Sequence, residues 1–269
     1  VICMIFEKVG EKCEYINIDS LSVYQSMAKG EVDIVHEIWE GAFGKFYEKV
    51  KIEGKIEEIL THDAIVKQGW WYPVYVEKVC PGLPAWRALL ECSNKFATPS
   101  SEGKGVFVAG PVDWLKHDAE KIKAFKINFI VKNMTSANSI WEELDAAVAK
   151  KKPIIIYNWS PNFIGEKYKG KFVEFPKFDP KCITDPSWGI NPNLLYDCAN
   201  SADGYLKLAV NKNFKKNHPN AYKIVKNINF SSTDIEKMAN YVETDKLKTT
   251  EAAQKWLEDN KKKWSEWIK

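Results

Sequence analysis

The sequence predicts an α/β protein of one large domain or two smaller lobes, because short β-branched and aromatic segments alternate with helical segments over the first 158 residues. The chain has 269 residues, of which 45% are apolar and 28% charged, so it can bury a core of its own. Strands that alternate with helices are typical of mostly parallel sheets, in which ligands bind at the loops that follow the strands.

The first elements follow this alternation closely. An apolar stripe over residues 2–9 predicts a helix that ends at Gly10. We then expect a strand at 14–18, a helix at 21–28 capped by Ser20, a strand at 32–38 and a helix at 42–50.

The later elements are marked by their aromatic and apolar composition. We expect strands at 70–76, 105–109, 129–132 and 153–158. Helices are predicted at 86–91, 118–125 and 136–150, and the chain is mostly helical from residue 214 onward.

The charge pattern argues against two classes of partner. Lys and Arg number 39 against 36 Asp and Glu, which gives a net charge of +3 with both signs interspersed. A nucleic-acid-binding surface would need a basic stripe or patch, and a membrane span would need about 20 consecutive apolar residues. The sequence shows neither pattern.

The cysteines fall into three pairs that are close in sequence. Cys80 with Cys92 and Cys182 with Cys198 have loop-closing spacings, and we interpret both pairs as disulfides. Cys3 and Cys13 form a third candidate pair. Such bonds indicate an oxidising compartment such as a periplasm, the alternative being six reduced thiols in a cytosolic protein.

The eleven tryptophans are an unusual number, and several follow predicted strands. Trp39 follows the strand at 32–38, Trp159 follows the strand at 153–158, and Trp114 comes a few residues after the strand at 105–109. Trp188 lies in a later irregular segment. Core tryptophans normally lie within an element, so we interpret these four as lining a ligand-binding cleft.

Several indole faces together suit either a sugar ring or a methylated ammonium group. A quaternary ammonium has no N–H and is weakly hydrated, and each well-placed ring stabilises it by about 0.5–2 kcal/mol. A betaine would also need a partner for its carboxylate. The backbone N–H groups of Leu115 and Lys116, just past Trp114 and before a helix, are our candidates for that contact.

Several segments together resemble the substrate-binding proteins of glycine betaine, proline betaine and choline ABC uptake systems. They are Ser22-Val-Tyr-Gln-Ser-Met-Ala-Lys-Gly-Glu-Val-Asp-Ile, Glu37-Ile-Trp-Glu, Gly110-Pro-Val-Asp-Trp, Pro153-Ile-Ile-Ile-Tyr-Asn-Trp-Ser-Pro-Asn-Phe and Trp256-Leu-Glu-Asp-Asn. The resemblance implies a two-lobe type II periplasmic-binding-protein fold with its ligand cleft between the lobes. Lobe one would comprise residues 1–76 and 190–269, and lobe two residues 77–189.

The resemblance also implies site residues and partners. The aromatic cage of the family maps onto Trp39, Trp114 and Trp159, and its carboxylate contacts map onto the amides of Leu115 and Lys116. The well-studied members carry Gly-Trp-Gly-Cys where this chain has Asp113-Trp-Leu-Lys. The expected partners are a methylated onium ligand and the membrane permease, which would read the closed form of a monomeric, periplasmic protein.

The family's first strand and a signal peptide are missing from this sequence, so we expect both in a longer precursor. Glu37 resembles a ligand contact of related members and would attract a cation, the alternative being a solvent-facing carboxylate. Trp188 would provide a fourth wall or pack beside the hinge.

Two other function classes stay open. A sugar-binding protein would pair its rings with many hydrogen-bonding side chains, but Arg87 is the sole arginine. An enzyme acting on a methylated amine should show a catalytic constellation. His36 and Glu37 begin a pattern like His-Glu-x-x-His, but the second histidine is absent. We therefore predict a non-enzymatic protein with no metal and no cofactor.

Overall fold

The computed structural model describes residues 1–19, 22–39, 44–200 and 204–269, and these residues fold into two compact units. Unit 1 comprises Val1–Val66, Pro161–Lys167 and Asp203–Lys269, and unit 2 comprises Lys67–Ser160 and Tyr168–Ala202. Each unit has its own sheet and its own buried apolar clusters.

Unit 1 is built on a three-stranded antiparallel sheet in the order β1-β8-β2. Its strands are β1 (Ile34–Trp39), β2 (Ile56–Thr61) and β8 (Leu206–Asn211). The central strand β8 is almost fully buried, since Leu208, Ala209 and Val210 are each 0% exposed. It is the strand on which the apolar clusters of this unit meet.

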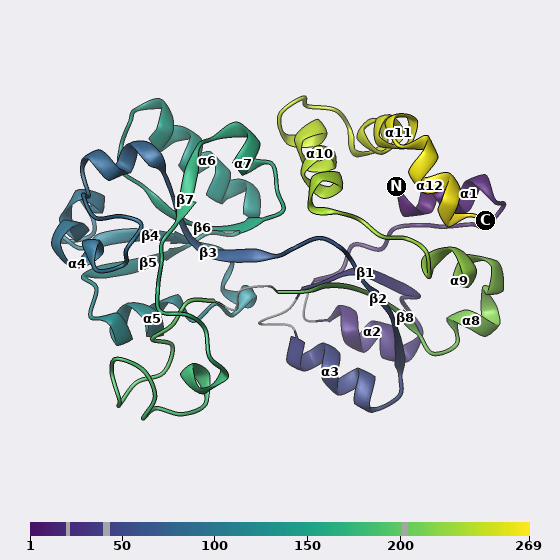
Figure 1. The fold of residues 1–269 in the computed structure, drawn as a ribbon, viewed down its shortest axis with the longest axis horizontal. Coiled ribbons are helices and arrows are strands. Elements are labelled where there is room, and N and C mark those ends of the chain that lie inside the picture. Colours follow the sequence, from purple (N-terminus) through teal and green to yellow (C-terminus); the bar gives the residue numbers. More distant parts are fainter. Residues whose placement is uncertain (20–21, 40–43, 201–203) are drawn as a thin grey trace. The chain divides into compact units, whose positions relative to one another are not determined.

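The helices of unit 1 come from both ends of the chain. The N-terminal ones are α1 (Ile2–Lys8), α2 (Val23–Lys29) and α3 (Gly44–Ile52), the short α7 (Ile164–Lys167) comes later, and the C-terminal ones are α8 (Phe214–Asn217), α9 (Pro219–Val225), α10 (Ser232–Glu243), α11 (Thr249–Asp259) and α12 (Lys261–Trp267). Figure 1 shows α1 in purple beside α12 in yellow, and both contribute to one apolar cluster. Among the described residues, no helix is both long and apolar enough to cross a membrane.

Two C-terminal tryptophans pack in the core of unit 1. Trp256 on α11 and Trp267 on α12 are buried and stack at 5.9 Å between ring centroids, at an interplanar angle of 21°. Phe230 meets both rings edge to face. This aromatic cluster connects the last two helices to the segment before α10.

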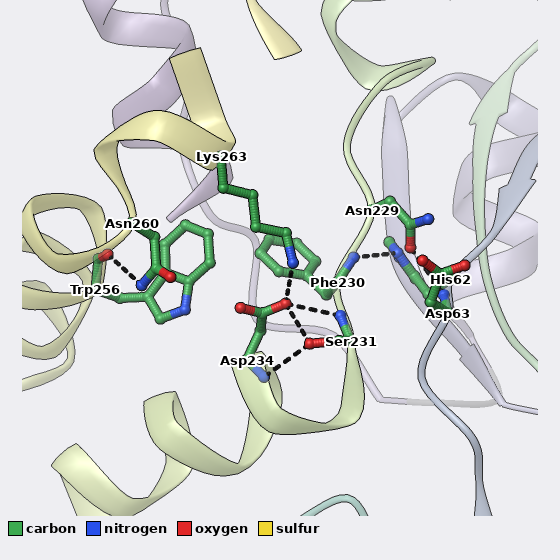
Figure 2. A network of polar contacts seen from close by, with 9 residues as sticks. All are labelled: His62, Asp63, Asn229, Phe230, Ser231, Asp234, Trp256, Asn260 and Lys263. Carbon is green, nitrogen blue, oxygen red and sulfur yellow. Dashed lines mark hydrogen bonds and ion pairs between the residues drawn. The ribbon is translucent and has the colours of Figure 1, made fainter. Parts of the chain in front are cut away.

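A polar network links that segment to the end of β2 (Figure 2). The backbone N–H of Phe230 donates to Nδ1 of His62 at 3.2 Å, and Asn229 Oδ1 accepts from the N–H of Asp63 at 2.8 Å. Ser231 caps α10 together with Asp234, whose carboxylate also accepts from Lys263. The network therefore ties the C-terminal helices to the residues that precede β3.

Unit 2 is built on a five-stranded mixed sheet in the order β5-β4-β6-β3-β7. Its strands are β3 (Lys67–Pro73), β4 (Gly105–Ala109), β5 (Phe129–Asn133), β6 (Ile155–Ser160) and β7 (Gly170–Phe172). The strand β4 pairs in parallel with β5 and β6, whereas β3 pairs antiparallel with β6 and β7. The core of this unit is aromatic: Trp70 stacks on Phe107 at 4.0 Å and 11°.

Short helices surround this sheet. They are η1 (Val74–Lys78), α4 (Ala88–Cys92), η2 (Ser93–Phe96), η3 (Val112–Trp114), α5 (Asp118–Phe125), α6 (Ala137–Ala149) and η4 (Pro180–Ile183), where η marks a 3-10 helix. The longest of them, α6, begins at a capping box formed by Ser136 and Ser139. Its buried residues Ile140, Trp141 and Leu144 lie on one face.

All three predicted disulfides are present. Cys3–Cys13 connects α1 to the segment after it, and Cys80–Cys92 connects the end of η1 to α4. Cys182–Cys198 closes the irregular loop that carries Trp188. Each bond closes a short loop of the chain, which restricts the unfolded state and stabilises the fold.

The prediction of mostly parallel sheets is wrong for unit 1 and half right for unit 2. Alternating strands and helices give parallel neighbours when consecutive strands pair. Here β8, more than 140 residues later in the chain, lies between β1 and β2 and pairs antiparallel with both. A sequence pattern that is read locally cannot reveal such a partner.

Several predicted elements also change. The strand expected at 14–18 is not part of a sheet, and its Tyr15 and Ile16 are exposed. The strand expected at 70–76 begins at Lys67 and ends at Pro73, which has no N–H to donate. The strand expected at 153–158 runs to Ser160, so it includes Trp159. Ser20, the predicted cap, lies outside the described residues.

The units and the predicted lobes share most of their residues but not their boundaries. Residues 67–76, expected in lobe one, lie in unit 2 because β3 pairs with β6 and β7. Residues 190–202 also belong to unit 2, where Asn191 Nδ2 donates to the carbonyl of Ala124 at 3.1 Å. The short segment Pro161–Lys167 belongs to unit 1.

The buried His62 makes the stability of unit 1 depend on pH. Because its Nδ1 accepts from Phe230, its Nε2 carries the proton and donates to the carbonyl of His36 at 3.1 Å. Burial lowers the pKa of His62 from 6.5 to about 4. The neutral ring therefore contributes stability that is fully present above pH 6.5 and is lost as pH falls towards 4.

We expect the free energy of unfolding to fall by about 2 kcal/mol between pH 7 and pH 5 because of this histidine. Urea unfolding at both pH values, followed by circular dichroism, measures the loss. The variant His62→Gln should reduce the difference, whereas His218→Gln, at a histidine outside this network, should not. An unchanged difference in His62→Gln would contradict this interpretation.

Candidate ligand-binding site

The pairing of β3 with β6 gathers aromatic side chains on one face of the sheet in unit 2. Gln68 lies opposite Trp159, and Trp70 lies opposite Tyr157. Directly opposed residues of antiparallel strands point to the same face, as do residues two apart on one strand. These four side chains therefore share a face.

Trp114 joins this face from outside the sheet. Its ring lies 5.5 Å from that of Trp159 at 81°, and 5.7 Å from that of Tyr157 at 63°. Trp159 also contacts Trp141 of α6 at 5.1 Å. Tyr157 and Trp141 are buried, whereas Trp114 and Trp159 are half-buried and keep part of their surface accessible to a ligand.

The chain before and after Trp114 has an unusual backbone. A Cβ added at Gly110 would lie 2.3 Å from Cε3 of Trp114, so only glycine allows the ring to lie so close to the backbone. Leu115 and His117 have positive φ angles of 49° and 56°, a conformation that non-glycine residues adopt when their surroundings impose it. The helix α5 begins only after these residues, at Asp118.

Between those two residues, Lys116 directs its side chain onto the aromatic face. Its Nζ donates to Oε1 of Gln68 at 2.8 Å and lies 5.2 Å from the centroid of the Tyr157 ring. The hydroxyl of Tyr157 donates to the same Gln68 oxygen at 2.6 Å. Burial lowers the pKa of Lys116 to about 8.

A row of buried polar groups continues from Lys116 along α5. Oδ1 of Asp118 accepts from Nε1 of Trp70 at 2.8 Å, and Nζ of Lys121 donates to Asn200 at 2.6 Å. Burial raises the pKa of Asp118 and lowers that of Lys121 to about 8. We call Lys116, Asp118 and Lys121 the polar row.

Trp39 and Glu37 lie together at the end of β1 in unit 1. Nε1 of Trp39 donates to Oε2 of Glu37 at 3.5 Å, a long bond between partly exposed groups. Trp39 packs against a small cluster that includes Val66 and Leu206. Glu37 is exposed and lines two hollows of unit 1, of about 330 and 1090 Å³.

The structure brings some of the predicted site residues together. Trp114 and Trp159 are in contact, Lys116 reaches their neighbour Tyr157, and Trp39 contacts Glu37. Trp188 is half-buried in the Cys182–Cys198 loop, and among the described residues no ring contact joins it to Trp114 or Trp159.

The Leu115 amide, predicted to contact a ligand carboxylate, already has a hydrogen-bond partner within the chain. Its N–H donates to the carbonyl of Val112 at 3.1 Å, a turn bond that a ligand would have to share.

Tyr157, Trp141 and Gln68 were missed by the sequence analysis. The signal for Tyr157 was present, since residues 157 and 159 alternate along one strand and therefore share a face. Gln68 carries no local signal, because its place depends on the pairing of two strands about ninety residues apart. Trp141 looked like an ordinary apolar position of a helix.

Comparison with known proteins agrees with this architecture. A family model described as the substrate binding domain of ABC-type glycine betaine transport system matches residues 1–259. The chain is 38% identical over its whole length to the trimethylamine N-oxide-binding protein of Pelagibacter ubique (strain HTCC1062), of which the alignment covers 85%. A glycine betaine/carnitine transport binding protein of Listeria monocytogenes is 26% identical over 133 residues, 49% of this chain and 37% of that protein.

Solved structures with little sequence identity share the fold. A lactococcal binding protein, in a closed conformation with glycine betaine, matches with a TM-score of 0.76 and 18% identity, over 100% of this chain and 92% of that chain. An ABC-transporter choline-binding protein in complex with choline matches with a TM-score of 0.75 and 14% identity, over 99% and 85%. The chain therefore has the two-lobe fold of these binding proteins.

We expect Gly110→Ala to displace the Trp114 ring from Trp159, because the added methyl group would overlap the indole. The near-ultraviolet circular dichroism of the tryptophans should change towards that of a Trp114→Phe variant. Gly165→Ala, whose Cβ meets nothing within 4 Å, is the matched control. A spectrum of Gly110→Ala identical to that of the control would contradict the packing described here.

Proposed function

The chain belongs to the family of substrate-binding domains of ABC-type glycine betaine transport systems, and on this premise we propose that it binds a small methylated onium compound and delivers it to the permease of an ABC transporter. The named relatives and structures bind trimethylamine N-oxide, glycine betaine or choline. These compounds share a trimethylated nitrogen. Trimethylamine N-oxide is the first candidate, because its binding protein is 38% identical over the whole chain.

The observation that carries this proposal is the half-buried pair of Trp114 and Trp159. Their rings stand at 81° to each other, so they form two walls of a corner. A quaternary nitrogen has no N–H to donate and is held by the negative faces of such rings, each supplying about 0.5–2 kcal/mol. The contacts of Trp159 with Trp141 and of Trp114 with Tyr157 hold the two walls in place before the ligand arrives.

We propose further ligand contacts for residues of each unit. Trp39 would add a further ring, and Glu37, within reach of the Trp39 indole, would attract the cation. Glu37 would also accept a hydrogen bond from the hydroxyl of choline. Trp188 would contact the ligand as a fourth ring, and the backbone amide of Lys116 would contact its negatively charged end.

The sugar-binding alternative finds less support in the structure. Sugar sites pair aromatic rings with hydrogen-bonding side chains, and arginine is a common one. The guanidinium of Arg87 lies 4.9 Å from the centroid of the Trp86 ring and makes a cation–π contact with it. Gln68 accepts from both Lys116 and Tyr157. A non-enzymatic role fits the transport family to which the chain belongs.

We further propose a periplasmic, monomeric protein that is recognised by the permease. The three disulfides support an oxidising compartment.

Isothermal titration calorimetry with trimethylamine N-oxide, glycine betaine and choline, and with maltose as control, tests the proposal. We expect at least one onium compound to bind and maltose not to bind. Binding of maltose alone would identify the aromatic face as a sugar platform and would overturn the proposal.

Substitutions at the rings test how the ligand is held. Trp114→Ala and Trp159→Ala should each weaken binding tenfold or more, and Trp39→Ala together with Trp159→Ala should abolish it. Trp159→Phe should retain part of the affinity because it keeps a ring. Trp264→Phe, at a C-terminal tryptophan bonded to the Leu257 carbonyl, is the matched control. Unchanged affinity in Trp39→Ala with Trp159→Ala would show that these rings do not hold the ligand.

A further inference from the structure

The polar row beside the aromatic face carries more positive than negative charge. It contains the ammonium groups of Lys116 and Lys121 and the single carboxylate of Asp118. Oδ1 of that carboxylate is bonded to Trp70, and the ammonium groups are bonded to the neutral amides of Gln68 and Asn200. Charges removed from water are normally matched by an opposite charge, and within the three described residues of this row the positive charges outnumber the negative ones by one.

Lys116 is the member of the row that is closest to the rings. It follows Trp114 by two residues, and its Nζ lies over the ring of Tyr157, which itself contacts Trp114 and Trp159. The positive φ angles of Leu115 and His117 turn the chain on both sides of it. Its half-buried side chain is therefore held near the rings and away from the bulk solvent.

We propose that the Lys116 ammonium binds the negatively charged oxygen of a zwitterionic ligand, so that the protein selects methylated N-oxides and betaines over the cation choline. This inference rests on the proposed function above. The carboxylate or oxide oxygen of such a ligand supplies a negative charge to the polar row, while its methylated nitrogen takes the indole faces. Choline has no negative end, so Lys116 repels it and gains nothing in return.

The Lys116 side chain adds a donor where the backbone amide of Leu115 is already engaged. The N–H of Leu115 is already bonded to Val112, so a ligand oxygen would receive only a shared hydrogen bond there. An ammonium group offers three donors and a full charge, and charge-assisted hydrogen bonds are about twice as strong as neutral ones. Nζ needs only to shift from the Gln68 oxygen, which keeps the Tyr157 hydroxyl as its donor.

The test compares ligand classes in two variants of the full chain. Lys116→Met removes the charge and keeps the length of the side chain, and Lys116→Arg keeps the charge. Affinities for trimethylamine N-oxide, glycine betaine and choline are measured by calorimetry, and thermal unfolding checks that each variant is folded. Lys132→Met is the matched control, since Lys132 lies exposed on β5 and pairs with Glu143 at 2.6 Å.

We expect Lys116→Met to weaken binding of the two zwitterions tenfold or more and to leave choline binding unchanged or tighter. Lys116→Arg should retain most of the zwitterion affinity, and Lys132→Met should match the wild type. An equal loss for all three ligands would show that Lys116 only supports Gln68 and Tyr157, and would overturn the inference. So would a wild type that binds choline but neither zwitterion. A wild type that binds none of the three would instead overturn the proposed function itself.

Discussion

The antiparallel pairing of β3 with β6 is the constraint on which the aromatic face of unit 2 depends. This register places Gln68 opposite Trp159 and Trp70 opposite Tyr157, so one face carries both the aromatic wall and its polar anchor. A shift by one residue would turn these side chains to the other face. Trp114 and Lys116 come from a separate segment. Their contacts with Trp159 and Gln68 depend on the pairing that brings those two residues to one face.

The aromatic face attracts cations, but the positive charge of Lys116 beside it repels them. Aromatic faces attract a cation, and Lys116 already places one over Tyr157. A second cation at Trp114 and Trp159 would meet the field of the first, which is strong where water is excluded. A ligand that carries its own negative charge removes this conflict. Burial lowers the pKa of Lys116 and Lys121. It also strengthens the attraction between these ammonium groups and a negatively charged ligand oxygen.

Much of the framework could be predicted from the sequence, because it rests on local signals. The spacing of the cysteines indicated all three disulfides, whereas Trp39, expected just after its strand, is the last residue of β1. What escaped prediction depends on distant partners. The strand β8 enters between β1 and β2 from far along the chain, and Gln68 gains its role only through pairing with β6. The direction of the Lys116 side chain follows from the positive φ angles of Leu115 and His117. Neither residue type indicates such an angle in the sequence.

The most direct test of the central claim is a crystal structure of the protein with glycine betaine bound. We predict that the trimethylammonium group lies against the faces of Trp114 and Trp159, and that a carboxylate oxygen lies within hydrogen-bonding distance of Lys116 Nζ. A ligand held with its carboxylate away from Lys116 would contradict the assigned selectivity. A ligand whose methylated head lies away from both indoles would contradict the binding face itself.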